Sequence, residues 1–288
     1  MAEEPNMVER TEPAKLEQNA GSNVKQVIGI MSGKGGVGKS LVCGLLAVEA
    51  QRKGLKVGIL DADITGPSIP HMFGIDNQRI TMMGKFLAPA ITSTGIKVMS
   101  INLMMNNPND PVIWRGSLIA GAVSQFWTDV AWGDIDVLFV DMPPGTGDVP
   151  LTVFQSLPIE GVVIVTSPQD LVSMIVNKAV KMADDMHVPV LGVVENMSYL
   201  VCPHCGERVE VFGKSQIHDI AKEHDLKVLA QLPIDSKMAE QIDRGRVEDV
   251  PEGLIDAKQV VEDAASARVR DALASGGFSF TTAPEAGK

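Results

Sequence analysis

The chain has 288 residues, of which 45% are hydrophobic and 21% charged, a composition typical of a folded protein with a sizeable core. Its formal net charge of −11 argues against a nucleic-acid partner, because such a partner needs a basic face. No apolar run approaches the roughly 18–20 residues of a membrane span. Three cysteines do not make a disulfide scaffold, so we expect a cytoplasmic protein with no nucleic-acid or membrane partner.

The two ends of the chain differ in composition from its middle. Residues 1–23 are polar and acidic and lack the apolar segment of a secretory signal, which favours a disordered tail. Residues 276–288 are rich in Gly, Ser, Thr and Pro and are predicted to form a flexible tail. We therefore expect one folded domain over residues 24–275.

Between these tails, short apolar runs typical of strands alternate with stretches of helical periodicity. The predicted strands cover residues 27–31, 56–60, 96–101, 137–140, 161–166, 188–194 and 227–232. The predicted helices cover residues 41–54, 117–130, 170–186, 213–224, 236–243 and 256–274. The less regular residues 76–95 and 103–115 are expected to carry a hairpin and surface loops. This alternation predicts an α/β fold, with a mostly parallel twisted sheet covered by helices on both faces.

A glycine-rich loop follows the first predicted strand and leads into the first predicted helix. Its sequence GKGGVGKS fits the phosphate-loop pattern G-x-x-x-x-G-K-[ST], in which backbone N–H groups hold a nucleoside triphosphate. Lys39 is expected to reach the β- and γ-phosphates, and the Ser40 hydroxyl to bind Mg²⁺. Strand, loop and helix predict a single P-loop NTPase domain. The expected nucleotide-binding residues here are Gly33, Lys34, Gly35, Gly36, Val37, Gly38, Lys39, Ser40 and Leu41.

Carboxylates end two of the later strands, at the sheet edge where ligands of open α/β folds bind. Asp61 and Asp63 follow the second strand and can serve Mg²⁺ and an attacking water, although such a pair can also be a solvated loop. Asp141 ends the apolar strand VLFV, which is the Walker-B pattern, and is expected to hold Mg²⁺ through water. Residues 142–148 then form a glycine-rich switch that can sense the γ-phosphate.

A Cys-Pro-His-Cys-Gly motif is the second candidate site. Cys202 and Cys205 can bind one metal or one cluster edge, but Zn²⁺ and a [4Fe–4S] cluster usually take four ligands. Cys43, the other cysteine, sits in the first helix and is interpreted as a core residue. The missing ligands must then come from another chain, as in a two-fold dimer. A bridging iron–sulfur cluster, a structural Zn²⁺ at the same place and a redox disulfide are the three interpretations left open.

Six segments carry a family resemblance that is specific in combination: GKGGVGKS (33–40), DADITGPSIP (61–70), PVIWRGS (111–117), DMPPGTGD (141–148), ENMSYLVCPHCG (195–206) and LPID (232–235). Together they resemble the Mrp family, also called ApbC, of iron–sulfur cluster carrier ATPases. The wider class includes MinD, ParA and the nitrogenase iron protein. The resemblance covers about residues 24–275. It implies an Mg²⁺-dependent ATPase that carries a [4Fe–4S] cluster between the subunits of a homodimer and transfers it to recipient apoproteins, working with other cluster-assembly proteins.

The resemblance also implies roles for single residues. Lys34 is the signature lysine that reaches the partner's nucleotide, so the implied catalytic residues are Lys34, Lys39 and Asp63, the last positioning water. Asn196 and the backbone near Pro233 match adenine contacts, which implies ATP. Three positions depart from the family pattern and could alter switch geometry or turnover: Leu41, Thr65 and Ser117.

Two other functions are weighed against the carrier. An ATP-switched positioning protein like ParA or MinD needs a basic DNA surface or a basic membrane helix, and the acidic chain offers neither. An electron-donating ATPase like the nitrogenase iron protein takes its two cysteines from well-separated loops, whereas Cys202 and Cys205 are close together. A zinc-bridged dimeric ATPase is a variant of the carrier hypothesis in which the bound metal differs.

Overall fold

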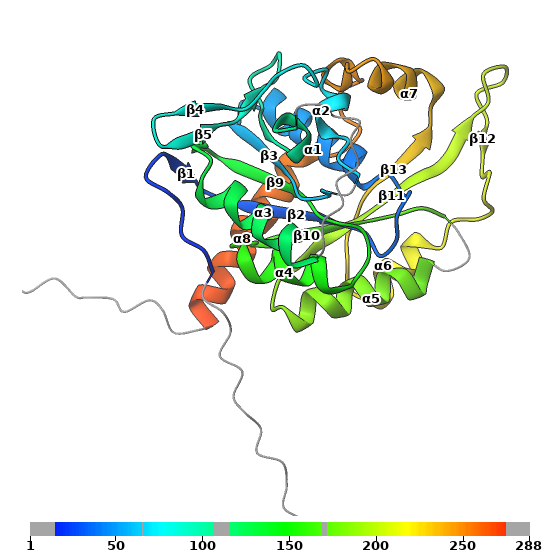
Figure 1. The fold of residues 1–288 in the computed structure, drawn as a ribbon. Coiled ribbons are helices and arrows are strands. Elements are labelled where there is room, and N and C mark those ends of the chain that lie inside the picture. Colours follow the sequence, from blue (N-terminus) through cyan, green and yellow to red (C-terminus); the bar gives the residue numbers. More distant parts are fainter. Residues whose placement is uncertain (1–14, 65, 106–115, 169–171, 275–288) are drawn as a thin grey trace, which may run out of the picture.

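A mostly parallel sheet runs through the centre of the molecule, with helices on both faces (Figure 1). The computed structural model describes residues 15–64, 66–105, 116–168 and 172–274. Within these ranges the sheet has nine strands. In chain order they are β2 (Val27–Met31), β3 (Val57–Asp61), β6 (Ala90–Ile91), β7 (Lys97–Met99), β9 (Val137–Asp141), β10 (Gly161–Thr166), β11 (Val190–Val201), β12 (Arg208–Val209) and β13 (Val228–Ile234).

The strand order brings the phosphate loop to the middle of the sheet. The order is β12-β11-β10-β2-β9-β3-β7-β6, with β13 paired to β11. All of these pairings are parallel except β11 with β12 and β6 with β7. The carboxyl ends of β2, β3 and β9 therefore lie side by side, and the residues that follow them share one edge of the sheet.

Helices cover the sheet in two layers, because its central strands are apolar on both faces. The helices of the described residues are α1 (Lys39–Arg52), α2 (Ile69–Met72), α3 (Gly116–Thr128), α4 (Asp148–Ser156), α5 (Val172–Asp185), α6 (Ile217–Glu223), α7 (Ser236–Asp243) and α8 (Ala257–Ala274), with 3₁₀ turns at Ile101–Leu103 and Val247–Asp249. Leu138 and Val140 of β9 pack into one core with α3 to α6, and Val137 and Phe139 pack into the other with α1, α2, α7 and α8. Successive strand residues alternate between faces, so a strand covered on both reads as a continuous apolar run.

This architecture confirms the predicted fold class, and each predicted strand and helix has a counterpart in the described residues. The hairpin expected within residues 76–95 is formed by β4 (Thr81–Met83) and β5 (Phe86–Ala88). The short helix α2 and helix α4 were not predicted. Residues 106–115, most of one predicted surface loop, lie outside the described residues. No helix in the described ranges has the length and apolarity that a bilayer crossing requires.

The chain packs against the domain several residues before residue 24, where the sequence predicts that the fold begins. Trp127 Nε1 donates to the Leu16 carbonyl at 2.9 Å. The Asn19 side-chain amide donates to the carbonyls of Thr128 and Val130 at 2.8 and 2.7 Å. β1 (Ser22–Val24) then pairs in parallel with β8 (Gly133–Ile135). Residues 15–23 thus provide hydrogen-bond partners for polar groups between α3 and β8. Residues 1–14 and 276–288 of the two predicted tails lie outside the described residues.

Strand β11 is longer than predicted. Its apolar run ends at Val194, where the sequence turns polar, but the strand continues to Val201. Partners on neighbouring strands sustain it: Thr166 of β10 lies opposite Glu195, and Pro233 and Ile234 of β13 lie opposite Tyr199 and Leu200. The extension carries the chain out of the sheet toward the two cysteines (Figure 1).

Candidate functional site

The phosphate loop connects β2 to α1 at the carboxyl edge of the sheet. Gly36 and Gly38 have φ angles of 81° and 83°, a left-handed conformation that favours glycine. Gly38 is the N-cap of α1, and no side chain caps that helix end. A Cβ at Gly38 would lie 2.2 Å from Asn196 Nδ2, whereas a Cβ at Gly35 or Gly36 would meet nothing within 4 Å. The loop is therefore closed on one side and open on the other, with an uncapped helix N-terminus that attracts anions.

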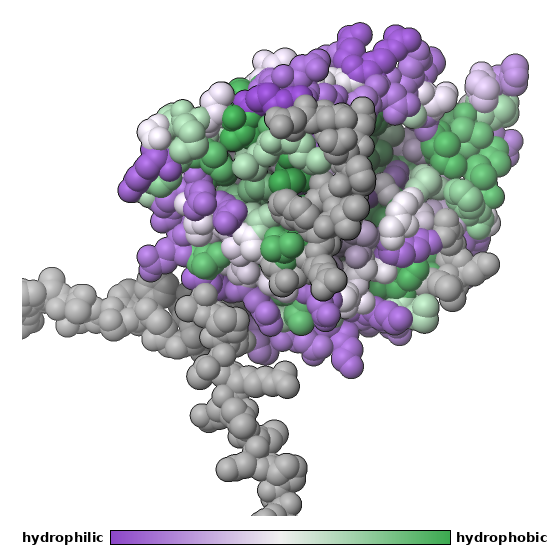
Figure 2. Space-filling view, viewed as in Figure 1, coloured by the Kyte–Doolittle hydropathy of each residue, from purple (hydrophilic) through white to green (hydrophobic). Residues whose placement is uncertain are grey.

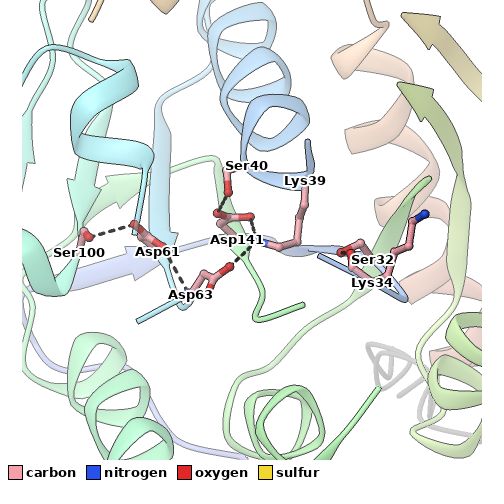
Figure 3. Close-up of polar contacts among 8 residues, drawn as sticks. All are labelled: Ser32, Lys34, Lys39, Ser40, Asp61, Asp63, Ser100 and Asp141. Atoms are coloured by element: carbon pink, nitrogen blue, oxygen red, sulfur yellow. Dashed lines mark hydrogen bonds and ion pairs between the residues drawn. The ribbon is translucent and has the colours of Figure 1, made fainter. Parts of the chain in front are cut away.

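Lys39 and Ser40 converge on Asp141 (Figure 3). Lys39 Nζ lies 2.6 Å from Asp141 Oδ1, and Ser40 Oγ donates to Asp141 Oδ2 at 2.5 Å. The side chains of Lys39 and Asp141 are 6% and 0% exposed. The neighbouring ends of β2 and β9 impose this contact, since α1 begins directly above them.

Burial and charge oppose each other in this cluster. Burial raises the pKa of Asp141, an effect that the Lys39 ammonium and the hydrogen bonds from Lys39 and Ser40 reduce. Burial alone would lower the pKa of Lys39, but the attraction of Asp141 and Asp63 outweighs it and the pKa is raised. Lys39 thus keeps its charge in a buried place, held by carboxylates.

Asp61 and Asp63, the two carboxylates at the end of β3, differ in how deeply they are buried. Asp61 is fully buried, and its oxygens accept hydrogen bonds from Ser100 Oγ at 2.9 Å and from the Asp63 N–H at 3.2 Å. Burial and then the nearby Asp141 raise the pKa of Asp61 well above its usual value. Asp63 is more accessible, with its side chain 13% exposed and its Oδ2 3.4 Å from Lys39 Nζ. Of these two carboxylates, only Asp63 is accessible enough to contact a bound molecule in this conformation.

The donor set fits a nucleotide phosphate with Mg²⁺. A hydroxyl and a carboxylate from Ser40 and Asp141 are the hard oxygen ligands that Mg²⁺ accepts, usually alongside water and substrate phosphates. Lys39 supplies a cation at the same point, and the loop glycines leave the space in front of their backbone open. The residues that the sequence predicts for phosphate and Mg²⁺ are therefore together in space.

Lys34 lies on the same loop but points elsewhere. Its carbonyl accepts a hydrogen bond from Ser32 Oγ at 2.9 Å, which fixes the backbone at the start of the loop. Its amino group is directed away from Asp141 and Asp63 (Figure 3). The side chain is half-buried. The side chains of Lys34 and Lys39 therefore point in different directions from the same loop.

The glycine-rich segment after β9 contacts the phosphate loop. The Gly145 N–H donates to the Ser32 carbonyl at 2.8 Å, and Gly145 has a φ of 91°. The segment leads into α4, which begins at Asp148. The predicted switch thus abuts the start of the phosphate loop.

The two residues expected to contact adenine lie on adjacent strands. Asn196 is 4% exposed, and its Nδ2 donates to the Val37 carbonyl of the phosphate loop at 3.0 Å. Pro233, half-buried on β13, lies opposite Tyr199 of β11. Leu41 is half-buried in the first turn of α1 and packs against the core on that face of the sheet. Thr65 lies outside the described residues, as does the Ser117 side chain.

Cys202 and Cys205 lie in the turn between β11 and β12, and this hairpin projects from the body of the molecule (Figure 1). The Cys202 N–H donates to the Glu207 carbonyl and the Gly206 N–H donates to the Cys202 carbonyl, both at 2.9 Å. Gly206 turns the chain with a φ of 75°. Cys202 is half-buried and Cys205 is exposed, and neither is in a disulfide. The motif thus forms a knuckle that presents thiols at the surface.

The knuckle favours a thiolate at Cys202. Hydrogen bonds from the backbone N–H groups of Cys205 and His204 lower the pKa of the Cys202 thiol. The thiolate is the form that binds metal. Among the described residues no three His, Cys, Asp or Glu side chains come close enough to hold a metal ion together. One chain therefore offers two thiol ligands at this place.

Exposed apolar side chains lie next to the knuckle on the same hairpin. They form the patch at the right of Figure 2, over β11 and β12. The patch, called the hairpin patch below, consists of Leu200, Val201, Val209, Val211 and Phe212, which are 36% to 49% exposed. Cys43 contrasts with the two surface cysteines, because it is 0% exposed in α1 and burial raises the pKa of its thiol well above the usual value. Its prediction as a core residue agrees with this burial.

Several polar residues of the site were not predicted. Ser32 and Ser100 hold the phosphate loop and Asp61, and a buried network at Glu195 joins Ser198, Ser215 and Gln231. A glutamate directly after the apolar run VLGVV was the available signal for the network. Its partners are scattered along the chain and gave none.

A phosphate loop between a central strand and a helix, with a Walker-B aspartate on the neighbouring strand, defines a P-loop NTPase. The chain belongs to the NUBPL iron-transfer P-loop NTPase family, whose model matches residues 23–267. This finding confirms the resemblance seen in the sequence.

Similar proteins include ones named iron–sulfur cluster carrier protein. One from Clostridium perfringens is 49% identical over 82% of this chain and 85% of its own length. One from Methanocaldococcus jannaschii is 44% identical over 85% of this chain and 83% of its own length.

Solved structures of other proteins are also similar to this chain. A nucleotide-binding protein of Archaeoglobus fulgidus in complex with ADP has a TM-score of 0.72 and 45% identity, covering 80% of this chain and 90% of that one. MinD of Aquifex aeolicus, at 18% identity and a TM-score of 0.55 over 90% of this chain and 99% of that one, shares the fold.

Proposed function

We propose that this protein is an ATP-dependent carrier of iron–sulfur clusters. It holds a cluster as cargo between two subunits and passes it to apo iron–sulfur proteins. One observation carries the proposal: the Cys202–Cys205 knuckle presents two surface thiols, one with a lowered pKa, on a P-loop NTPase of the iron-transfer family. The similar proteins named iron–sulfur cluster carriers support it.

The nucleotide part of the proposal uses the cluster around Asp141. The loop backbone and Lys39 bind the β- and γ-phosphates of ATP, and Ser40 with Asp141 holds Mg²⁺. When bound, Mg²⁺ neutralises charge on the phosphates. Lys39 exchanges part of its contact with Asp141 for phosphate, since its 2.6 Å ion pair occupies the amino group here. Asn196 and Pro233 contact the adenine.

Hydrolysis in this proposal needs two further residues. Asp63 orients the attacking water, because it is the more accessible of the two carboxylates at the end of β3. Lys34 acts on the nucleotide of the partner subunit. Its direction away from Asp141 and Asp63 in its own chain supports this role (Figure 3).

The cargo part requires two chains. Two thiols per chain match half of the four ligands that a [4Fe–4S] cluster usually takes, so a homodimer with two-fold symmetry completes the set. The hairpin patch supports this arrangement, because covering its exposed apolar side chains with a second copy would stabilise the dimer. Free thiols and cluster chemistry suit a reducing compartment, and we place the activity in the cytoplasm, where other cluster-assembly proteins load the carrier.

Anaerobic reconstitution tests the cargo. The wild-type protein is treated with iron and sulfide, and its absorption spectrum, iron, sulfide and zinc contents and dimer fraction are measured. We expect iron and sulfide in a dimer, and activation of an apo [4Fe–4S] enzyme when the loaded protein is added. The double variant Cys202→Ala/Cys205→Ala should bind no cluster, while Cys43→Ala serves as the matched control and should load normally. A full cluster in the double variant, or zinc without iron in the wild type, contradicts the proposal.

A further inference from the structure

A buried carboxylate lies where the cysteine hairpin leaves the sheet. Glu195 of β11 is 0% exposed. Ser198 Oγ donates to its Oε2 at 2.5 Å, Ser215 Oγ lies 2.8 Å from both carboxylate oxygens, and Gln231 Nε2 donates to Oε2 at 2.9 Å. No Lys or Arg of the described ranges forms an ion pair with Glu195. The carboxylate is thus held by uncharged donors from three segments of the chain.

A buried carboxylate at this strand position costs free energy if it serves only to fill space. Burying an ionised carboxylate is unfavourable unless hydrogen bonds replace its water, and an apolar side chain would fill a strand position at lower cost. Glu195 follows Val193 and Val194, which are fully buried in the two cores. The change from Val to Glu at the next position therefore indicates a role for the hydrogen bonds themselves.

The donors of Glu195 bracket the cysteine hairpin. Ser198 lies before Cys202 in the chain, and Ser215 lies after the hairpin returns. Both hydroxyls bond to the same carboxylate, so the two ends of the excursion are joined at its base. The hairpin beyond this point is largely exposed and projects from the body (Figure 1). Its base is therefore held by the hydrogen bonds at Glu195 together with the pairing of Tyr199 and Leu200 with β13.

The residue next to Glu195 touches the nucleotide loop. Asn196 donates to the Val37 carbonyl and fills the space beside Gly38. Met197 then adopts a left-handed φ of 56°, which is uncommon outside glycine. The register between β11 and β13 shifts at the same place, between Glu195 and Tyr199. Asn196 thus links the phosphate loop to the adjoining Glu195 and to the left-handed turn at Met197.

We propose that Glu195 is a positioning residue that couples the phosphate loop to the direction of the Cys202–Cys205 hairpin. Nucleotide at the loop then alters how firmly the hairpin holds its cluster. The inference rests on the proposed function, because it concerns the control of the same cargo. A two-state coupling of this kind requires that nucleotide favour one hairpin orientation over the other.

A merely structural carboxylate makes a different prediction. If Glu195 only stabilised the fold, its loss would lower stability equally with and without nucleotide. The decisive readout is therefore a ratio: the rate at which the loaded dimer loses iron to a chelator with Mg²⁺ and ATP, divided by the rate without nucleotide. Ser215→Ala removes one hydroxyl from the network at a half-buried site, and Glu195→Gln replaces the carboxylate with an amide. Ser215→Thr keeps a hydroxyl and is the matched control.

The expected result is a loss of coupling without a loss of loading. In the wild type and in Ser215→Thr the two rates should differ by at least about fivefold, the lower range of measured couplings. In Ser215→Ala and Glu195→Gln the ratio should come within about twofold of one, with cluster loading and ATP binding at wild-type levels.

Other outcomes overturn the inference in distinguishable ways. Wild-type ratios in both variants overturn it and leave the proposed function intact. A ratio of one in the wild type overturns the ATP-dependent carrier and the inference together. Failure of Ser215→Ala to load a cluster shows a structural role and also overturns the inference. If Glu195→Gln does not fold, the pair Ser198→Ala and Ser215→Ala decides by the same ratio.

Discussion

The phosphate loop and the cysteine hairpin are built in opposite ways. Around the loop, Lys39 and Asp141 are almost fully buried and each charge has a partner within the same chain. At the hairpin, Cys205 is exposed and the surrounding side chains of the hairpin patch face outward. The difference teaches that the ion pairs at the phosphate loop form within one chain, whereas the proposed cluster site at the hairpin takes its remaining ligands from a second chain. ATP hydrolysis that depends on Lys34 in trans would make the first region depend on a second chain as well.

The largest expected effect tests that dependence. Lys34→Ala should lower ATP hydrolysis about 10³-fold, as removal of an arginine finger does, because in the proposed function Lys34 delivers the cation to the partner's phosphates. ATP binding should stay near the wild-type level, since Lys39 remains in place. Steady-state phosphate release and fluorescent-nucleotide titration measure the two quantities. Lys53→Ala, an exposed lysine just after α1, is the control. Unchanged hydrolysis in Lys34→Ala would falsify the role in trans.

A change at Asp141 sharpens the comparison by breaking only the buried region. Asp141→Asn leaves Lys39 with the more distant Asp63 at 3.4 Å, so the nucleotide-free protein should lose about 3 kcal/mol of stability, at the low end for a broken buried pair. Denaturant unfolding measures this loss, with Asp243→Asn, an exposed carboxylate of α7, as the control. The folded variant should still load a cluster in full. Loss of loading per folded molecule would mean that the two regions are not assembled independently.

The glycines of the loop allow a finer test within one region. Gly38→Ala places a Cβ 2.2 Å from Asn196 Nδ2 at a φ of 83°, so it should lower the free energy of unfolding by about 1–3 kcal/mol and displace Asn196. Gly35→Ala, where a Cβ meets nothing within 4 Å, is the matched control for stability. Thermal unfolding without nucleotide compares them. Equal midpoints for the two variants would show that Asn196 does not close the loop at Gly38.

The smallest effect concerns a surface pair outside both regions. Asp136 accepts hydrogen bonds from Lys25 Nζ at 2.7 Å and the Lys56 N–H at 2.8 Å, and these, led by the Lys25 contact, lower its pKa. A lowered folded-state pKa stabilises the fold above the usual value of 3.8, and that contribution is lost as the pH falls through the folded-state pKa. Asp136→Asn should therefore cost at most about 1 kcal/mol at pH 7, and less below pH 3. Unfolding at both pH values checks this, and a loss that grew on acidification would contradict the assignment.

The two regions also differ in how far the sequence predicts them. The phosphate loop is contiguous and its chemistry follows from residue type, so Lys39, Ser40 and Asp141 were expected together, and the structure places them in contact. The Glu195 network was not expected, because Ser215 and Gln231 approach it only through tertiary folding. Residues 15–23 were assigned to a tail for the same reason, since the partners of Leu16 and Asn19 lie more than a hundred positions away.

Strand β11 shows a third limit of prediction. An apolar run locates a buried strand, and the run ends at Val194. The strand continues because Thr166 of β10 and Pro233 of β13 supply neighbours for residues whose own side chains are polar or exposed. Strand propensity depends on such context more than helix propensity does. The cysteine motif was recognised, but its place at the end of a projecting hairpin could come only from the fold.

The reactivity of the buried Cys43 thiol can report how often helix α1 separates from the sheet. A thiol-modifying reagent that reacts with thiolates reaches Cys202 and Cys205 at the surface, but reaches Cys43 only when α1 separates from the sheet. The slow third modification therefore reports the free energy of that separation, with no label introduced. Because α1 begins at the phosphate loop, the same slow reaction measures how strongly any bound nucleotide clamps the helix in place.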